Sequence, residues 1–157
     1  MTDIILIHVG DFKEDYFRRA QAEYEKRLGG FCRFRCVCIK EEREGDSAAE
    51  NEKALRREGE RIFAAIPDGA YVFALCVEGE QMSSEAFAAG LESLSMSVSR
   101  IVFIIGSSRG LSAEVKNRAD KRLSFSKMTL PHRLMRIVLT EQIYRAFMIN
   151  AGREYHK

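Results

Sequence analysis

One segment near the end of the chain carries side chains that could hold or move a proton, or contact an anion. Residues 125–136, FSKMTLPHRLMR, form a hydroxyl-bearing stretch that stops at Pro131 and continues directly into a helical pattern. On a helical wheel, one polar quadrant of this last helix collects four side chains: His132, Arg133, Arg136 and Thr140. An imidazole and two guanidinium groups on one face suit proton transfer or the binding of a phosphate-bearing ligand.

A second segment, IVFIIGSSRGLS at residues 101–112, has the form of a ligand-binding turn. A buried strand runs into a turn with Gly106 and Gly110 and then into the start of a helix, where backbone N–H groups are free. The spacing matches neither the dinucleotide pattern G-x-G-x-x-G nor the phosphate-loop pattern ending in G-K-[ST]. Taken alone, the pattern favours two tight-turn glycines, and a ligand-binding loop is the alternative.

The last helix is apolar nearly all round. Leu134, Ile137, Val138 and Met148 share a stripe that also contains Glu141 and Arg145, four residues apart. A charge pair among apolar residues is costly to bury, so we expect it to be paired across an interface or used in a site. A helix of this kind needs partners on two sides. A second subunit is one such partner, and a helix enclosed within one chain is the alternative.

The elements that must position these residues alternate regularly between strand and helix patterns. The expected strands are 3–10, 31–39, 70–77, 101–106 and 123–128. The expected helices are 12–28 with Asp11 as its cap, 47–66, 83–94, a short helix capped by Ser112, and 131–150. This order predicts an α/β fold, an open and mostly parallel sheet with helices on both faces, with ligands at the carboxyl ends of the strands.

The four cysteines predict no metal site. Three lie within FCRFRCVCI, where alternation puts Cys32, Phe34, Cys36 and Cys38 on one strand face that we expect to be buried. Neighbours on one strand face stand about 7 Å apart, too far for adjacent zinc ligands, and no C-x-x-C pair exists. We therefore expect reduced thiols in the core and no metal.

Length and charge set the class of protein. The 157 residues fit one domain, 1–157. Residues 1–99 hold 13 Lys and Arg against 19 Asp and Glu, whereas residues 100–157 hold 12 against 4. The basic last third predicts contact with nucleic acid or phosphate, and a solvated charged face is the alternative. No apolar run is long enough for a membrane span, and the N-terminus lacks the positive charge of a signal peptide, so we expect a cytoplasmic protein.

Three stretches carry a specific resemblance to a known family: IVFIIGSSRGLS, LSFSKMTLPHRLMRIVLTEQIYRAF and the terminal REYHK. The chain resembles the bacterial ribosomal RNA large-subunit methyltransferase H family, small SPOUT-superfamily enzymes that methylate N3 of a pseudouridine in 23S rRNA. The resemblance implies S-adenosylmethionine as methyl donor, a homodimer, and a trefoil knot formed by the C-terminal segments. General rules of chain topology argue against a knot, so only the resemblance predicts it.

Carried onto this sequence, the family's cofactor pocket falls on eight residues: Leu75, Gly106, Phe125, Ser126, Lys127, Met128, Thr129 and Leu130. The hydroxyl-rich stretch would then be the knotted loop around the cofactor. One departure concerns the turn: relatives commonly have Gly-Gly-x-x-Gly, whereas Ser107 stands here at the second position and Arg109 adds a positive charge. A left-handed backbone at position 107 would be strained for serine.

The same resemblance implies roles for the polar residues. Methyl transfer to an imide nitrogen requires positioning and the loss of one proton, with no metal and no covalent nucleophile. His132 and Arg136 are the candidate catalytic residues, His132 as base. A phosphate contact is the alternative for His132, and Arg136 or Arg153 would stabilise the anion. The candidate RNA-binding residues are Arg133, Arg153, Tyr155 and His156. The substrate would be 23S rRNA within the ribosome. The competing hypothesis is a non-enzymatic RNA- or ribosome-binding module.

Overall fold

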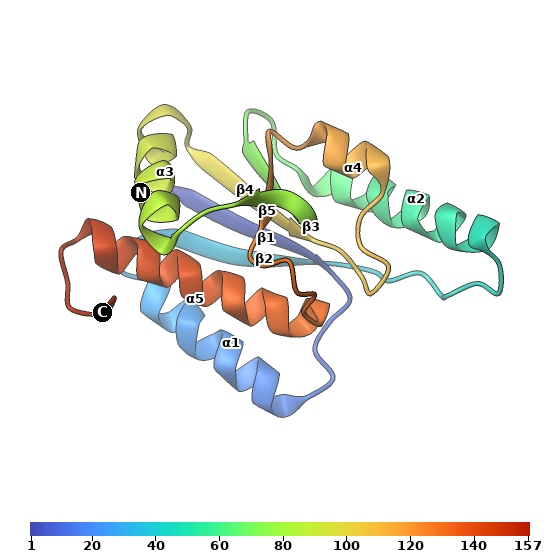
Figure 1. Cartoon of the computed structure of the whole chain (residues 1–157), viewed down its shortest axis with the longest axis horizontal. Helices are drawn as coiled ribbons and strands as arrows, with labels where there is room; N and C mark the ends of the chain where they lie inside the picture. The colour runs from blue at the N-terminus through green and yellow to red at the C-terminus, as the bar shows by residue number, and fades with distance from the viewer.

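A computed structural model describes residues 1–157 and has a five-stranded parallel sheet with helices on both faces (Figure 1). The strands are β1 (Asp3–Val9), β2 (Arg33–Ile39), β3 (Tyr71–Gln81), β4 (Arg100–Ile105) and β5 (Lys121–Ser124). The helices are α1 (Asp15–Leu28), α2 (Ala48–Ala65), α3 (Ser84–Ser97), α4 (Ala113–Arg118) and α5 (His132–Asn150). The strand order is β2-β1-β4-β3-β5, and every strand pair is parallel, so the predicted α/β fold class is confirmed.

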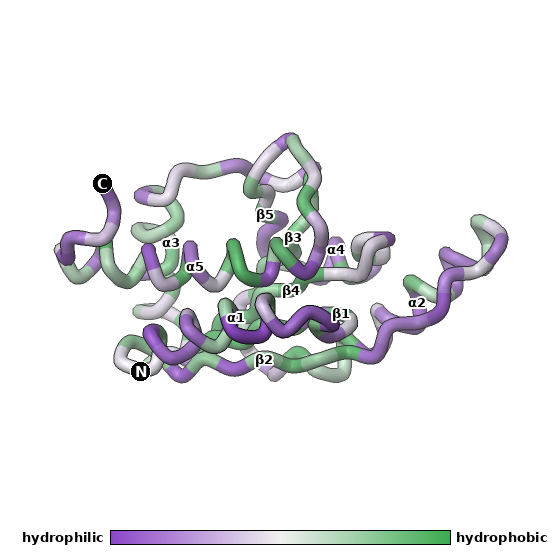
Figure 2. The backbone as a smooth tube through the Cα atoms, turned by 90° about the horizontal axis from the view of Figure 1, so that it is seen from below, coloured by the Kyte–Doolittle hydropathy of each residue, from purple (hydrophilic) through white to green (hydrophobic).

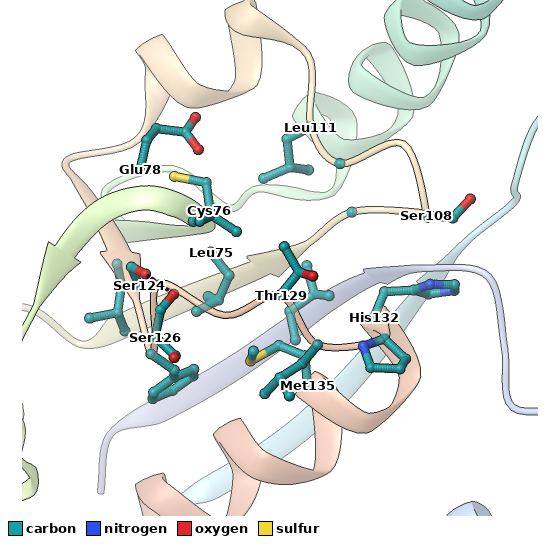
Figure 3. Close-up of a pocket in the computed structure, with 18 of the residues that line it drawn as sticks. Leu75, Cys76, Glu78, Ser108, Leu111, Ser124, Ser126, Thr129, His132 and Met135 are labelled. Atoms are coloured by element: carbon teal, nitrogen blue, oxygen red, sulfur yellow. Dashed lines mark hydrogen bonds between the residues drawn. The ribbon is translucent and has the colours of Figure 1, made fainter.

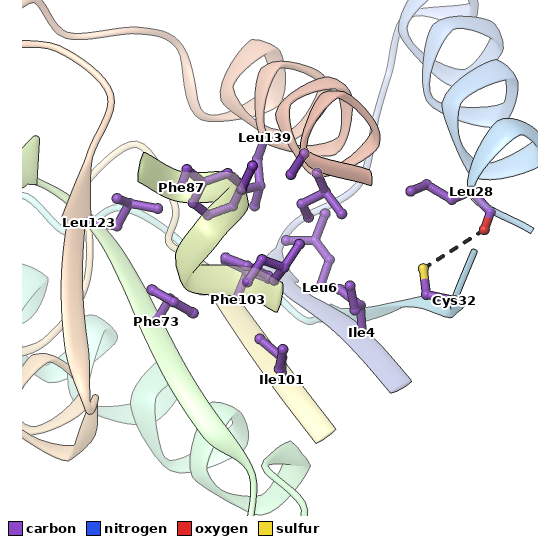
Figure 4. Packing of buried hydrophobic residues seen from close by; sticks show 14 of the residues in the cluster. Ile4, Leu6, Leu28, Cys32, Phe73, Phe87, Ile101, Phe103, Leu123 and Leu139 are labelled. Carbon is purple, nitrogen blue, oxygen red and sulfur yellow. Dashed lines mark hydrogen bonds between the residues drawn. The ribbon is translucent and has the colours of Figure 1, made fainter. Parts of the chain in front are cut away.

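The central strands are apolar on both faces because both faces are covered. Ile4 and Leu6 of β1 belong to a core with residues of α1, α3 and α5, whereas Ile5 and Ile7 belong to a second core with residues of α2 and α4. In the first core, the rings of Phe73 and Phe103 stack with their centroids 4.8 Å apart (Figure 4). Continuous apolar runs of this kind are typical of parallel strands covered on both sides.

Three serine caps fix where helices begin. The hydroxyls of Ser47, Ser83 and Ser112 each accept a backbone N–H from the first turn of α2, α3 and α4. The predicted Asp11 cap is wrong: α1 begins at Asp15 without a side-chain cap, and the Asp11 carboxylate accepts from the backbone N–H of Phe12. Asp11 therefore closes a local turn ahead of the helix.

Two expectations for edge strands are also wrong. The last strand is 121–124, not 123–128, because Lys121 and Arg122 pair with Phe73 and Ala74 of β3 at an edge where charged side chains reach solvent. The cysteine face is only partly buried: Cys32 is buried, Cys36 is half-buried and Cys38 is exposed, since β2 is the opposite edge strand. All four thiols are free.

The hydropathy of the helices differs from one helix to another. Figure 2 shows a mainly hydrophilic α2, whereas α5 alternates between hydrophobic and hydrophilic residues along its length. No helix in the structure has both the length and the apolar character that crossing a membrane requires. The trefoil knot of the C-terminal segments stays a prediction.

Candidate functional site

A cavity of about 780 Å³ opens at the carboxyl ends of the strands, where the sequence predicted the ligand site (Figure 3). Its walls come from the end of β3, the turn that follows β4, and the segment between β5 and α5. Of the eight predicted cofactor residues, seven line it: Leu75, Gly106, Phe125, Ser126, Met128, Thr129 and Leu130. Lys127 lies outside the lining and is exposed.

The first wall is the turn from Gly106 to Gly110. A Cβ atom added to Gly106 would lie 2.3 Å from the carbonyl oxygen of Gly110, so only glycine fits there. The Gly110 N–H donates to the Ser107 carbonyl at 2.8 Å, and Gly110 has a φ of +81°. No non-glycine residue has a positive φ, so Ser107 is unstrained. The interpretation as tight-turn glycines is therefore confirmed. Gly106 and Gly110 also line the cavity, and a ligand-binding role for this turn stays a prediction.

The second wall is the loop of residues 125–130, which we call the cofactor loop because the family resemblance predicts that it holds the cofactor. It makes no backbone–backbone hydrogen bond. Its few bonds involve serine side chains: the Ser124 hydroxyl donates to the Ser126 carbonyl at 3.0 Å, and the Ser126 hydroxyl accepts from the Met128 N–H at 3.0 Å. Met128 is 78% exposed. The remaining backbone donors and acceptors of this loop are free to bind a ligand.

His132 is the first residue of α5 and lines the cavity beside Thr129 and Met135 (Figure 3). Its Nε2 atom is buried without a hydrogen-bond partner. Burial lowers the pKa of the imidazole, and so does the positive charge of Arg133, whereas Glu41 and Glu58 act in the opposite direction. The neutral imidazole is thus favoured, which is the form that can accept a proton.

Arg136 lies one helical turn from His132 but does not line the cavity. Its guanidinium sits 3.9 Å from the ring centroid of Phe12 and 3.5 Å from the Asp11 carboxylate, and the residue is 7% exposed. The polar quadrant seen on the helical wheel is therefore divided: His132 faces the cavity, and Arg136 packs against the segment before α1.

Arg136 also affects the buried His8 of β1. The pKa of His8 is lowered to about 4, mainly by burial and then by the Arg136 charge, while Asp11 and Glu25 oppose the shift. Its Nδ1–H donates to the Gly10 carbonyl at 2.7 Å. This histidine is therefore neutral near pH 7 in the folded protein.

The predicted RNA-binding residues fall in two places. Arg133 is near the cavity and donates to the Asp11 carbonyl at 3.2 Å. The tail lies at the other end of α5, about 27 Å away for a 19-residue helix. There Arg153 covers the ring of Phe31 at 5.3 Å, and Tyr155 donates its hydroxyl to Glu141 at 3.0 Å. His156 bridges Arg145 and Glu85.

The Glu141–Arg145 pair has a partner that the sequence did not suggest. Arg145 donates to Glu141 at 2.6 Å, and the same carboxylate accepts from Tyr155, so the pair is satisfied by its own chain and its tail. No residue of the tail lines the cavity of its own chain. A contact of the tail with this site would need a second copy of the protein.

Sequence reasoning missed part of the cavity wall. Cys76 and Val77, at the end of the predicted strand, and Glu78, where β3 continues past that end, line the cavity with Lys116 of α4. Lys116 donates to Glu78 at 2.5 Å, which lowers the pKa of the glutamate. The signal was available, since ligands bind where parallel strands end. No group of three or more His, Cys, Asp or Glu side chains in the structure is arranged to hold a metal ion.

Comparison with known proteins assigns the family. Residues 2–156 match the family model described as Predicted SPOUT methyltransferase. The chain belongs to the SPOUT methyltransferase family. It is 53% identical over 158 residues to a Ligilactobacillus salivarius protein and 50% identical over 155 residues to one from Streptococcus thermophilus, both named Ribosomal RNA large subunit methyltransferase H. These matches cover 99% of both chains in the first case, and 97% of this chain and 98% of the relative in the second.

A solved structure has a similar fold. A probable methylase family protein from Haemophilus influenzae superposes with a TM-score of 0.54 at 15% identity, covering 99% of this chain and 70% of the other. At this identity the similarity is evidence for the fold alone. The resemblance to the methyltransferase H family, inferred from the sequence, is confirmed by the full-length relatives.

Proposed function

We propose that residues 1–157 act as one SPOUT methyltransferase domain that transfers a methyl group from S-adenosylmethionine to N3 of a pseudouridine in 23S rRNA. The substrate is the assembled ribosome, and the protein works in the cytoplasm. One observation carries the proposal: the cavity at the strand ends is walled by a loop that makes no backbone–backbone hydrogen bond and bonds only two of its backbone groups to serine side chains. Full-length relatives named for rRNA methylation support the reaction class.

The cavity has the size and chemistry that S-adenosylmethionine requires. Its volume of about 780 Å³ falls within the range of roughly 300–1,000 Å³ typical of small-molecule sites. Leu75, Ile105 and Leu111 offer apolar walls to a planar base, and the cofactor loop offers backbone N–H and C=O groups to its polar edges. When bound, the cofactor supplies a methyl group on a sulfonium centre. Orienting it and excluding water are the tasks of this chain.

His132 takes the proton that the imide nitrogen must lose. The imidazole lines the cavity, its Nε2 has no partner, and burial favours its neutral form. Arg136 acts from behind it: the guanidinium ties α5 to Asp11 and Phe12, and so fixes the start of the helix that carries His132. Stabilisation of the imide anion by Arg136 or by Arg153 stays a prediction.

A homodimer explains two features of α5. The side chains of Leu134, Ile137 and Val138 are half-buried, and none packs into either core. The tail, with Arg153, Tyr155 and His156, lies at the far end of α5 from the cavity. A partner that covers the apolar stripe would bring a second tail toward the first cavity, where it can contact RNA. Ile143, by contrast, is fully buried in the protein's own core and so contributes to the fold rather than directly to the interface.

Binding of S-adenosylhomocysteine tests the cofactor. Calorimetry should give micromolar affinity for the wild-type protein, and His132→Asn should keep that affinity while lowering kcat by about 100-fold, within the range of general-base contributions. A folded wild-type protein that binds no S-adenosylhomocysteine would favour the non-enzymatic ribosome-binding module instead.

Base mapping tests the substrate. Deleting the gene should remove one methyl group from N3 of a pseudouridine in 23S rRNA, and purified protein with S-adenosylmethionine should restore it on ribosomes from the deletion strain. Removal of residues 153–157 should lower this activity by about 100-fold, or roughly 3 kcal/mol, without weakening S-adenosylhomocysteine binding. Parallel loss of binding would instead make the tail part of the cofactor pocket.

A further inference from the structure

Glu58 is a buried carboxylate that the reaction described above does not use. It lies on α2, is 2% exposed, and does not line the cavity. Buried carboxylates are rare unless paired, so its partners indicate what it does.

Both oxygens of Glu58 accept hydrogen bonds, and each accepts one from the turn that forms the first wall of the cavity. Oε1 accepts from the Ser107 hydroxyl at 3.1 Å. Oε2 accepts from the Arg109 guanidinium at 3.1 Å and from the backbone N–H of Glu42 at 2.9 Å. Two of the three donors belong to the turn between Gly106 and Gly110, the first wall of the cavity.

Arg109 depends on Glu58 for its charge balance. The guanidinium side chain is 11% exposed, and its Nε and Nη1 atoms are buried without partners. It also donates to the Glu42 carbonyl at 2.9 Å. Without Glu58, a largely buried cation would be left without a counterion, which is strongly unfavourable. Arg109 would then move toward solvent and take the turn with it.

The remaining contacts transmit the position of Glu58 to the cavity. The Ser107 carbonyl accepts the Gly110 N–H, and the Gly110 carbonyl lies directly against the position of a Gly106 Cβ atom. Next to Glu58, a Cβ on Gly59 would lie 2.9 Å from the Ser112 hydroxyl, so α2 packs closely on the start of α4. The carboxylate is thus held at a fixed distance from the turn.

We propose that Glu58 is a positioning residue that fixes the Gly106–Gly110 turn, through Ser107 and Arg109, in the shape the methyl-donor site needs. The proposal rests on the proposed function for the identity of the ligand. Ser107 and Arg109 are then a matched set: each places a donor on the same buried carboxylate.

Glu58→Gln tests this with two independent measurements, because it keeps the size of the side chain and removes its charge. We expect S-adenosylhomocysteine to bind at least 10-fold more weakly by calorimetry. In the ligand-free protein, we expect amide hydrogen exchange at Gly110 to speed up at least 10-fold, while the amides of Val102 and Ile104 in β4 keep their protection. Glu60→Gln, an exposed change on the same helix, is the control and should alter neither quantity.

The two measurements separate this inference from the proposed function. If the wild-type protein binds no S-adenosylhomocysteine, the proposed function fails, and exchange at Gly110 still decides whether Glu58 holds the turn. A folded Glu58→Gln protein with wild-type affinity and wild-type exchange would overturn the inference, even with a lower melting temperature. Should Glu58→Gln fail to fold, Ser107→Ala removes one of the bonds without stranding a charge. It should speed exchange at Gly110 about threefold, and unchanged exchange would overturn the inference.

Discussion

The two walls of the cavity are built in opposite ways. The turn from Gly106 to Gly110 is closed by an internal hydrogen bond and held from behind by the buried Glu58. The cofactor loop, residues 125–130, has no backbone–backbone hydrogen bond and exposes Met128 and Leu130. One wall is therefore formed before any ligand arrives, and the other has its backbone groups available.

This difference suggests a division of work in binding. A preformed wall lowers the ordering cost of association, whereas a loop that orders on the ligand adds cost but can enclose it. Steric changes in the turn should therefore abolish binding. Changes in the loop should matter only where they remove backbone donors, and its exposed side chains should matter little.

Gly106→Ala should have the largest effect, because its Cβ would lie 2.3 Å from a backbone carbonyl that cannot move aside without opening the turn. We expect S-adenosylhomocysteine affinity to fall at least 300-fold, about 3.4 kcal/mol, by calorimetry. Gly90→Ala is the matched control, since nothing lies within 4 Å of its Cβ position in α3. Wild-type affinity in folded Gly106→Ala would show that the turn is not rigid.

Acid should weaken the sheet that supports both walls, through His8. The pKa of His8 is about 4 in the folded protein against 6.5 as its ordinary value. The unfolded chain therefore binds more protons between these values, and stability is complete above pH 6.5 and lost as the pH falls toward 4. This contributes about 3 kcal/mol to the free energy of unfolding.

Comparison with His8→Asn isolates this contribution. In denaturant titrations at pH 6.5 and pH 4, the wild-type protein should lose about 3 kcal/mol more than the variant, because the carboxylates titrate in both proteins and cancel. Equal losses would mean that His8 opens to solvent in the folded state. The part of the sheet around His8, which supports both cavity walls, would then be mobile.

Thr129→Pro tests the loop through its backbone. Proline removes one N–H and fixes φ, so we expect affinity for S-adenosylhomocysteine to fall about 30-fold, or roughly 2 kcal/mol. Thr129→Ala keeps the backbone and should lose threefold or less. If alanine costs as much as proline, the loop binds through its side chains, and the contrast between the walls is smaller than we infer.

Met128→Ala should have the smallest effect. The side chain is 78% exposed and is not part of either core. We expect less than a twofold change in S-adenosylhomocysteine affinity and no change in melting temperature. A larger loss of affinity would show that Met128 folds onto the ligand, which would make the loop a closing wall with its own apolar contact.

The sequence alone predicted the architecture because hydrophobic periodicity and the residues that begin or end helices and strands are local properties of the chain. The apolar runs at 70–77 and 101–106 marked the first part of β3 and all but the first residue of β4, and Ser47 and Ser112 marked two helix starts. The position of the cavity followed from the rule that ligands bind where parallel strands end. The family resemblance predicted the residues of the cofactor loop and the reaction. Full-length relatives confirm the family itself.

Only the tertiary structure decided which side chains face the cavity. The helical wheel grouped His132 with Arg136, but packing of α5 between α1 and α3 sends Arg136 against Phe12 and leaves His132 in the cavity wall. The tertiary structure also placed the tail beside Glu141 and Glu85. It brought Glu58 into contact with Ser107, which is 49 residues away in the chain. Periodicity fixes which residues share a face of a helix. The neighbour that each face meets depends on contacts between distant segments, and no local pattern encodes them.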